Sequence, residues 1–275
     1  MNKIFTGLFL MTIFPFFSNA QYYYKDFIGV KQAAKDMAAY KKAGIHAIKI
    51  KSYEANGEES EDFFCEKKIS KDYKKASLYT RSGLSGKSLM ESFFNEKGLL
   101  IKTYDSSEMV VSSNLFEYDE DNRLVKSIST SKSNDDDFLN EITDEHIYNY
   151  KDEFMPLSMT RIKNNHDSLT ILFSLDESGN IAVEKDTKTA AKFYYYYDQN
   201  GITDVVHSNE FKNKLIADYI FEYNEAGQIS QMTTTEEGDN NYFVWKYNYE
   251  NNLKIRESIF SKDGMIMGKI EYEYK

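Results

Sequence analysis

The residues that could do chemistry are few, and the histidines come first. No two of them show the i,i+4 spacing that lets a pair of imidazoles hold one metal on a helix; they are His46, His146, His166 and His207. Two short runs, Asp144-Glu145-His146 and His166-Asp167-Ser168, set acids beside imidazoles, but adjacent residues on a strand point to opposite faces. We therefore expect the histidines on the surface or in turns, and we predict no catalytic residue and no metal site.

The single cysteine and two glycine-rich stretches give no stronger signal. Cys65 follows Phe63 and Phe64, which is typical of a small buried apolar residue, and one cysteine permits no internal disulfide. Gly86-Lys87-Ser88 resembles the end of a phosphate-binding loop, but that loop needs glycine where the chain has Arg81. Gly83-Leu84-Ser85-Gly86 begins like a nucleophile elbow and then has Lys87 instead of glycine, so we expect a turn.

Acidic residues are too numerous to be informative as catalysts. With 44 of them, some pair of carboxylates would always suit glycoside hydrolysis. Calcium is the more specific alternative, because three loops supply oxygen ligands, but none has the twelve-residue EF-hand spacing; the acids are Asp119 and Asp121, Asp135 to Asp137, and Glu236, Glu237 and Asp239. We predict no cofactor, and calcium binding by these loops stays open.

Residues 1–20, MNKIFTGLFLMTIFPFFSNA, have the pattern of a secretory signal peptide. Lys3 precedes an apolar run from Ile4 to Phe17, and Ser18-Asn19-Ala20 puts small residues before a cleavage point that leaves Gln21 first. The alternative, a membrane anchor, needs about 20 apolar residues, and the run is shorter. We expect export to a periplasm, a cell surface or the exterior, with no membrane span in the mature chain.

The charge excludes one class of partner. Processing removes Lys3, so 33 basic residues remain against 44 acidic ones, and the mature chain carries a net charge of 33 − 44 = −11. Nucleic acids bind basic surfaces, so no nucleic-acid partner is expected.

A short pattern recurs through the chain: an aromatic or leucine, then Asp, Asn or Ser, two mostly polar residues, Gly or Asn, and an aliphatic residue. Asp, Asn or Ser suits the first position of a type I turn, and Gly or Asn suits a following left-handed residue, so each copy predicts the tip of a β-hairpin with a bulge. The copies start at Phe94, Tyr118, Leu175, Tyr197, Tyr223 and Phe260, with weaker copies at Tyr150 and Tyr249.

The segments flanking these turns alternate with period two, as half-buried strands do. Tyr219, Phe221 and Tyr223 share one face, and Ile270, Tyr272 and Tyr274 oppose Glu271 and Glu273. Eight copies predict about sixteen strands, so the fold class is all-β: a meander of repeated antiparallel hairpins in a curled or spiralling sheet, since a flat sheet that wide is disfavoured.

The repeat resembles the YD repeat of Rhs and teneurin-type proteins. Phe116-Glu117-Tyr118-Asp119, Tyr195-Tyr196-Tyr197-Asp198 and Phe221-Glu222-Tyr223-Asn224 carry the likeness best, over roughly residues 90–275. The resemblance implies hairpins wound into a spiralling sheet. The chain has too few repeats to build the large hollow shell of that family, and no toxin segment follows the last repeat, so that role is not carried over.

The stretch before the repeats predicts one helix. Val30 to Lys42 lacks Gly and Pro, Ala34, Met37, Ala38 and Lys41 form a weak stripe, and Gly44 is a C-cap. We expect this helix to cover an end of the sheet. The predicted domains are a signal peptide (1–20), an N-terminal helical cap (21–45) and a hairpin-repeat domain (46–275), with further hairpins starting near residue 45.

These patterns favour an exported, non-enzymatic binding scaffold of the cell envelope whose ligand is a protein or an envelope glycan. Two alternatives remain: a structural protein that associates with copies of itself, and a glycan-acting enzyme. A row of exposed, coplanar aromatic side chains along one groove would favour sugar recognition; aromatics buried between hairpins would be scaffold.

Overall fold

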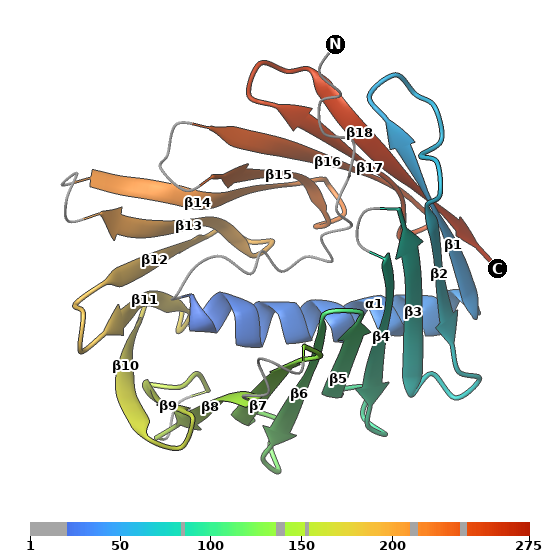
Figure 1. The fold of residues 1–275 in the computed structure, drawn as a ribbon. Helices are drawn as coiled ribbons and strands as arrows, with labels where there is room; N and C mark the ends of the chain where they lie inside the picture. The colour runs from blue at the N-terminus through green and yellow to red at the C-terminus, as the bar shows by residue number, and fades with distance from the viewer. Residues whose placement is uncertain (1–20, 84–85, 136–140, 152–153, 210–213, 237–240) are drawn as a thin grey trace.

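Eighteen antiparallel strands surround one helical segment (Figure 1). The structure is a computed structural model, and it describes residues 21–83, 86–135, 141–151, 154–209, 214–236 and 241–275. The strands are β1 (Ala47–Glu54), β2 (Phe64–Ile69), β3 (Lys75–Ser82), β4 (Gly86–Phe94), β5 (Leu100–Ser107), β6 (Val110–Tyr118), β7 (Leu124–Ser133), β8 (Glu141–Asn149), β9 (Ser158–Lys163), β10 (Asp167–Leu175), β11 (Ile181–Asp186), β12 (Lys192–Tyr197), β13 (Ile202–Asn209), β14 (Lys214–Tyr223), β15 (Ile229–Thr235), β16 (Tyr242–Glu250), β17 (Leu253–Ser261) and β18 (Ile266–Tyr274).

The sheet closes on itself. Each strand pairs with the next along the chain, and β1 pairs with both β2 and β18. In the closing pair, Ile48 lies opposite Tyr274 and Ser52 lies opposite Ile270. The predicted all-β hairpin meander is confirmed, including hairpins that begin near residue 45. The curl goes further than the expected spiral, because the end strands meet and form a barrel without a free edge.

The repeated turns behave as their sequence predicts. At the β4–β5 turn, Gly98 is left-handed with φ of 77°, its N–H donates to the carbonyl of Asn95, and Asn95 Oδ1 accepts the Lys97 N–H at 3.0 Å. Asn122 takes the same left-handed role at the β6–β7 turn. Six of the seven turns from β4–β5 to β16–β17 carry a register shift at the strand before the turn, as a hairpin with a bulge requires. These turns lie on one rim, because the strands alternate in direction.

One copy of the pattern lies elsewhere. Phe260 precedes the turn between β17 and β18, which is on the opposite rim of the barrel. Its turn chemistry is the same, with Gly264 at φ of 75°. The sequence pattern therefore identified a turn type correctly but did not identify its rim.

The helix starts earlier than predicted and ends where predicted. A π-helical stretch, η1 (Tyr24–Ile28), leads into α1 (Gly29–Ala43), and Gly44 ends it with φ of 68°. The predicted stripe was wrong in phase, since Ala38 and Lys41 are exposed. The buried side of α1 is instead formed by Val30, Ala33, Met37 and Tyr40.

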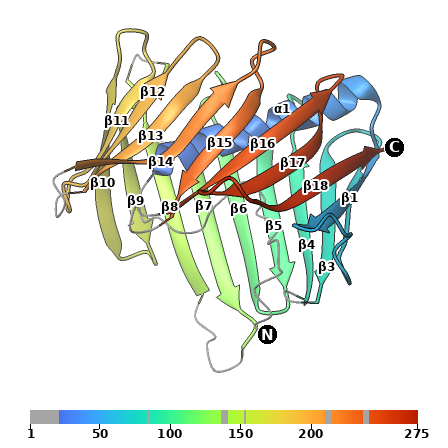
Figure 2. The same ribbon diagram turned by 90° about the horizontal axis from the view of Figure 1, so that it is seen from above.

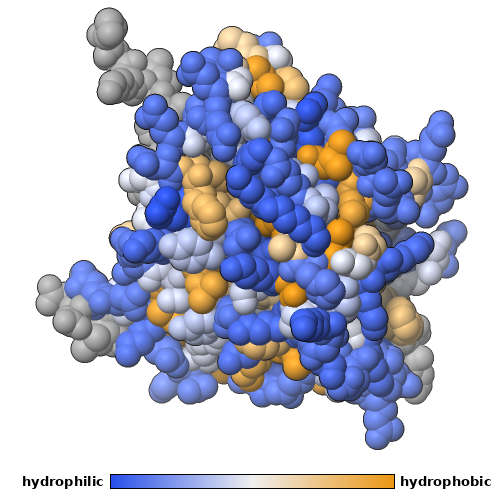
Figure 3. All heavy atoms as spheres, turned by 90° about the vertical axis from the view of Figure 1, so that its right-hand side faces the viewer, coloured by the Kyte–Doolittle hydropathy of each residue, from blue (hydrophilic) through white to orange (hydrophobic). Residues whose placement is uncertain are grey.

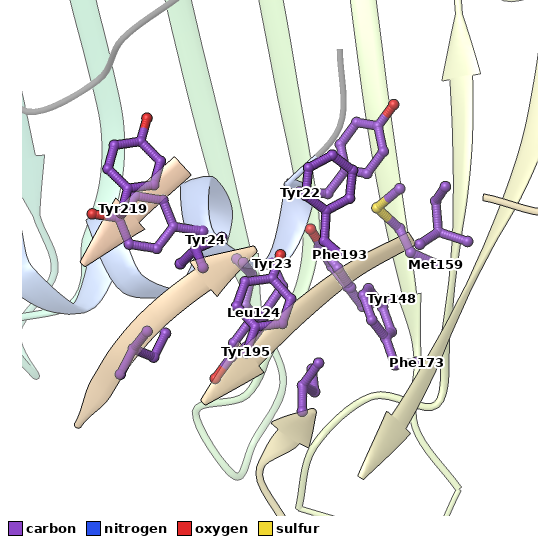
Figure 4. Close-up of a cluster of buried hydrophobic side chains, with 14 of the residues drawn as sticks. Tyr22, Tyr23, Tyr24, Leu124, Tyr148, Met159, Phe173, Phe193, Tyr195 and Tyr219 are labelled. Atoms are coloured by element: carbon purple, nitrogen blue, oxygen red, sulfur yellow. The ribbon is translucent and has the colours of Figure 1, made fainter. Parts of the chain in front are cut away.

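The helix lies inside the barrel, near the rim with the repeated turns (Figures 1 and 2). The helix was expected to cover an end of the sheet, and the structure places it in the interior close to one rim. Closure creates an interior that a single small element can fill, and the apolar side of α1 packs there against Ile48, Ile50 and Cys65. The segment Tyr22–Tyr24 packs in a second cluster with Met159, Phe173 and Tyr195 (Figure 4).

The outer wall carries both charged and exposed apolar side chains, the latter including Leu115, Leu172 and Tyr196. Ion pairs join neighbouring strands across it, including Lys75 with Glu91, Lys126 with Glu145, and Lys51 with Glu273. Figure 3 shows one such face, where hydrophobic side chains form only scattered patches.

Candidate functional site

The tyrosines that start most repeats form hydrogen bonds between neighbouring hairpins along one rim of the barrel. Tyr118 donates its hydroxyl hydrogen to the carbonyl of Leu100 at 2.7 Å, the residue just after the preceding turn. The same bond recurs along the rim, each time reaching back by one turn: Tyr150 to Leu124, Tyr197 to Ile181, Tyr223 to Ile202, Tyr249 to Ile229 and Tyr274 to Lys254. The repeat tyrosines are thus half-buried scaffold residues whose hydroxyl groups serve the backbone.

This result removes one argument for sugar recognition. The exposed tyrosines of the described residues, Tyr79, Tyr196 and Tyr242, lie on β3, β12 and β16 and do not form one row. Sugar recognition by the repeats was expected only if exposed aromatic side chains formed such a row. The many aromatic residues of the repeats therefore do not support a glycan ligand.

A buried charged cluster fixes the helix to the wall. One carboxylate oxygen of Asp26, in η1, accepts hydrogen bonds from Ser127 Oγ at 2.9 Å and the Tyr148 hydroxyl at 2.5 Å, and it lies 2.6 Å from His146 Nδ1. On the other side of the imidazole, Asp144 lies 3.4 Å from His146 Nε2 and also binds Arg161. The register places Ser127, His146 and Arg161 on the inner face of three successive strands.

The two carboxylates keep His146 charged. Burial alone lowers the pKa of the imidazole, but attraction by Asp26 and Asp144 outweighs burial and raises the pKa to about 9. The same cluster lowers the pKa of Asp26 and Asp144 against the opposing effect of their own burial. The cluster is a network of charges that holds the helix in place.

The grouping of Ser127, His146 and Asp26 does not have the geometry of a nucleophilic triad. A triad needs the hydroxyl on one imidazole nitrogen and the carboxylate on the other. Here Ser127 Oγ and Asp26 both approach Nδ1, at 3.4 and 2.6 Å, and the hydroxyl donates to the carboxylate. Ser127 and His146 are also less than 10% exposed, so a substrate has no access to them.

The histidine expectation was therefore wrong for His146. Glu145 does point to the outer wall, as strand alternation requires, but Asp144 and His146 are two residues apart and share the inner face. His207 is half-buried and paired with Asp218, whereas His46 bonds the Tyr73 hydroxyl and His166 lies in an exposed turn. The i,i+2 spacing of Asp144 and His146 on a predicted strand is the sequence signal from which this cluster could have been predicted.

Other residues singled out from the sequence lie apart. Cys65 is 1% exposed, and burial raises the pKa of its thiol. Asp119 accepts the Arg123 N–H and side chain within its own turn, which is a structural role. Among the described residues, no three His, Cys, Asp or Glu side chains gather as metal ligands; Leu84, Ser85, Asp136, Asp137, Glu237 and Asp239 lie outside those residues.

Beyond the helix, the inner face of β4 to β7 becomes mostly polar, with Met90 as an apolar residue among the polar ones. Near the helix it presents Phe94, Leu100 and Leu124, all buried. Further along, the register places half-exposed hydroxyl, amide and carboxyl groups on the same face, and we call them the inner polar strip: Ser92, Thr103, Asp105, Asn114 and Ser129. Figure 2 shows these strands extending well past the helix.

The inner polar strip is internally connected. Ser129 Oγ donates to Asn114 Oδ1 at 2.5 Å, and Asn114 Nδ2 donates to Thr103 Oγ1 at 2.8 Å. Burial raises the pKa of Asp105. On another part of the wall, Trp245 pairs with Met232, which pairs with Phe221 of the core, so the only tryptophan also faces inward and is half-buried.

A shallow groove of about 330 Å³ crosses the outer wall of β5 to β8. Tyr104, Ser113, Thr130 and Lys132 line it, and Ser113 Oγ lies 2.8 Å from Thr130 Oγ1. It is a second polar surface, separated from the inner polar strip by the thickness of the sheet.

Comparisons with known proteins assign the chain neither a family nor a function. No protein-family profile and no curated protein matches the chain by sequence. Among solved structures, a porin-like protein from Bacteroides uniformis is similar at 8% identity, with 84% of this chain and 98% of that chain covered and a TM-score of 0.40. A porin-like protein from Bacteroides vulgatus has the same identity and coverage, with a TM-score of 0.29.

The TcdB2-TccC3-TEV structure is similar at 12% identity with a TM-score of 0.36, and the alignment covers 84% of this chain. This chain spans only 14% of the length of that one. At this identity and TM-score, the similarity does not assign the chain to a family, and the YD-repeat resemblance stays a prediction from the sequence. Separately, no helix in the described part of the chain has the length and apolar character needed to cross a membrane.

Proposed function

We propose that the chain is an exported, non-enzymatic binding protein of the cell envelope and that it binds its ligand on the inner polar strip. The supporting observation is the division of the inner wall. On β4 to β7, the inner wall near α1 presents the buried apolar residues Phe94, Leu100 and Leu124, and farther along the same strands present half-buried Thr103, Asn114 and Ser129. A barrel wall with only a packing role would present apolar side chains at those positions too.

The chemistry of the strip favours an uncharged, hydroxyl-rich ligand. Its groups are hydroxyl and amide side chains that both donate and accept hydrogen bonds, with Asp105 as the one carboxyl group. An envelope glycan has the matching chemistry, and this argument is independent of the repeat tyrosines. An extended peptide backbone is the alternative ligand.

To test this, envelope oligosaccharides are titrated into the chain that begins at Gln21. Binding is measured through the fluorescence of the single tryptophan, Trp245. The variants Asn114→Ala and Ser129→Ala should each weaken binding about tenfold, the effect of roughly one lost hydrogen bond. Ser113→Ala and Thr130→Ala are matched controls, because they remove a hydroxyl pair from the outer face of the same two strands.

The outcomes separate the alternatives. Weakening by the outer pair alone would place the ligand in the outer groove and overturn the proposed site. A protein would be the ligand instead of a glycan if two results came together. No oligosaccharide would bind, and the wild-type chain would capture one envelope protein that the Asn114→Ala chain does not capture.

A further inference from the structure

The first described residues enter the barrel at a buried carboxylate. Glu184 is 1% exposed, and its Oε1 accepts the backbone N–H groups of Gln21 and Tyr22, both at 3.1 Å. Its other oxygen accepts the Tyr23 N–H at 3.0 Å and the Tyr195 hydroxyl at 2.9 Å. Glu184 therefore gathers the first three backbone nitrogens of the described chain.

The side chain of Gln21 is held as firmly. Its Nε2 donates to Asp218 Oδ2 at 2.7 Å, and Asp218 is itself bound by His207 Nδ1 at 2.9 Å. Gln21 is only 2% exposed, which is unusual for a glutamine. Two carboxylates on different strands, β11 and β14, thus hold the backbone and the side chain of one residue.

We propose that Glu184 is the binding site for the α-ammonium group that cleavage after Ala20 creates on Gln21. The proposal rests on the export step of the proposed function. The sequence places the cut directly before Gln21, and the nitrogen freed by that cut is the atom that already donates to Glu184 Oε1. Processing would turn a neutral hydrogen bond into a buried ion pair.

The physical reason is the cost of a buried carboxylate. Glu184 is surrounded by four neutral hydrogen-bond donors, and burial still raises the pKa of its carboxyl group. A full positive charge at hydrogen-bond distance is the missing compensation. In the unprocessed chain that nitrogen is a neutral amide, so the native barrel is less stable before cleavage than after it.

The pair has a second consequence for Gln21. A terminal glutamine cyclises when its free amine attacks its own side-chain carbonyl and ammonia leaves. Glu184 keeps the amine protonated and Asp218 holds the amide nitrogen, so neither group is available for the reaction. The mature protein should retain an uncyclised Gln21.

The experiment compares the chain that begins at Gln21 with one that retains Ala20, in which the Gln21 nitrogen stays an amide. The shorter chain should melt about 5 °C or more above the longer one. Glu184→Gln should remove this difference. Glu257→Gln, which changes another buried inward glutamate on β17, should preserve it. Equal melting temperatures in the two wild-type chains would overturn the proposal.

A second readout does not require the variants to fold. The α-amine of the native shorter chain should react with an acylating reagent at least about tenfold more slowly than in the same chain unfolded in urea. Reaction at the unfolded rate, or an intact mass showing loss of ammonia from the terminus, would contradict the ion pair. The intact mass of the exported protein tests the cut itself, and none of these readouts depends on ligand binding.

Discussion

At the scale of single residues, the rim tyrosines have two separable contributions, the packed ring and the hydroxyl bond. Tyr118→Phe keeps the ring and removes the bond to the Leu100 carbonyl, leaving that acceptor without its partner. We expect the free energy of unfolding in urea to fall by about 1 kcal/mol. Tyr196→Phe is the control, because Tyr196 is 47% exposed on the outer face, and it should change stability little. Equal effects of the two changes would contradict the structural role of the hydroxyl.

Also at this scale, His146 makes stability depend on pH. Its pKa is about 9 in the folded chain and about 6.5 in an unfolded one, so the folded state binds the proton more tightly. The resulting stabilisation is complete below about pH 6.5 and is lost as pH rises through 9, by about 3 kcal/mol. Asp26 and Asp144, whose pKa values are lowered, stay charged throughout this window. Urea unfolding at pH 6, 7.5 and 9 measures the loss, and an unchanged slope in His146→Gln would contradict it.

At the scale of elements, the helix depends on Asp26 more than on its own surface charges. Asp26→Asn removes the charge that faces His146, leaving a buried cation compensated only by Asp144. We expect destabilisation of about 3 kcal/mol in urea unfolding. Asp36→Asn is the comparison on α1: this half-buried carboxylate accepts a bond from Gln32 and attracts the Lys67 ammonium, and the change should cost clearly less than Asp26→Asn. A comparable cost for both variants would mean that Asp26 does not fix the helix.

The elements also show what the sequence could and could not predict. Turn chemistry is local, so the turns at Asn95, Gly98 and Asn122 were predicted correctly from the sequence. Strand alternation is local too: Tyr219 and Phe221 share one face as expected, and in the structure that face is the buried, inner one. The buried side of α1 was missed by about one residue, because alanines on both sides of Met37 left the apolar stripe ambiguous and the wall around the helix decided between them.

At the scale of the whole molecule, closure was the decisive unpredicted feature. The hairpin pattern fixes how neighbouring strands pair, but the pairing of β1 with β18 depends on accumulated twist and strand number. Closure alone creates an inside, where Asp26 meets Ser127 and His146, which already lie opposite each other on β7 and β8. For the same reason Glu184 and Asp218 could not be connected to Gln21 from the sequence.

Closure of the barrel also predicts what happens when the closing strand is removed. Removing residues 266–275 deletes β18, and with it the seven-residue register that runs from Ile48–Tyr274 to Glu54–Gly268. Both β1 and β17 then become edges with unpaired backbone groups, while the helix loses part of the wall that encloses it. We expect this chain to aggregate in size-exclusion chromatography. Four residues inserted at Gly264, in the turn between β17 and β18, lengthen the connection but keep every pair, and that chain should elute as the wild type does. A soluble, cooperatively unfolding truncated chain would mean that the barrel does not depend on its closing pair.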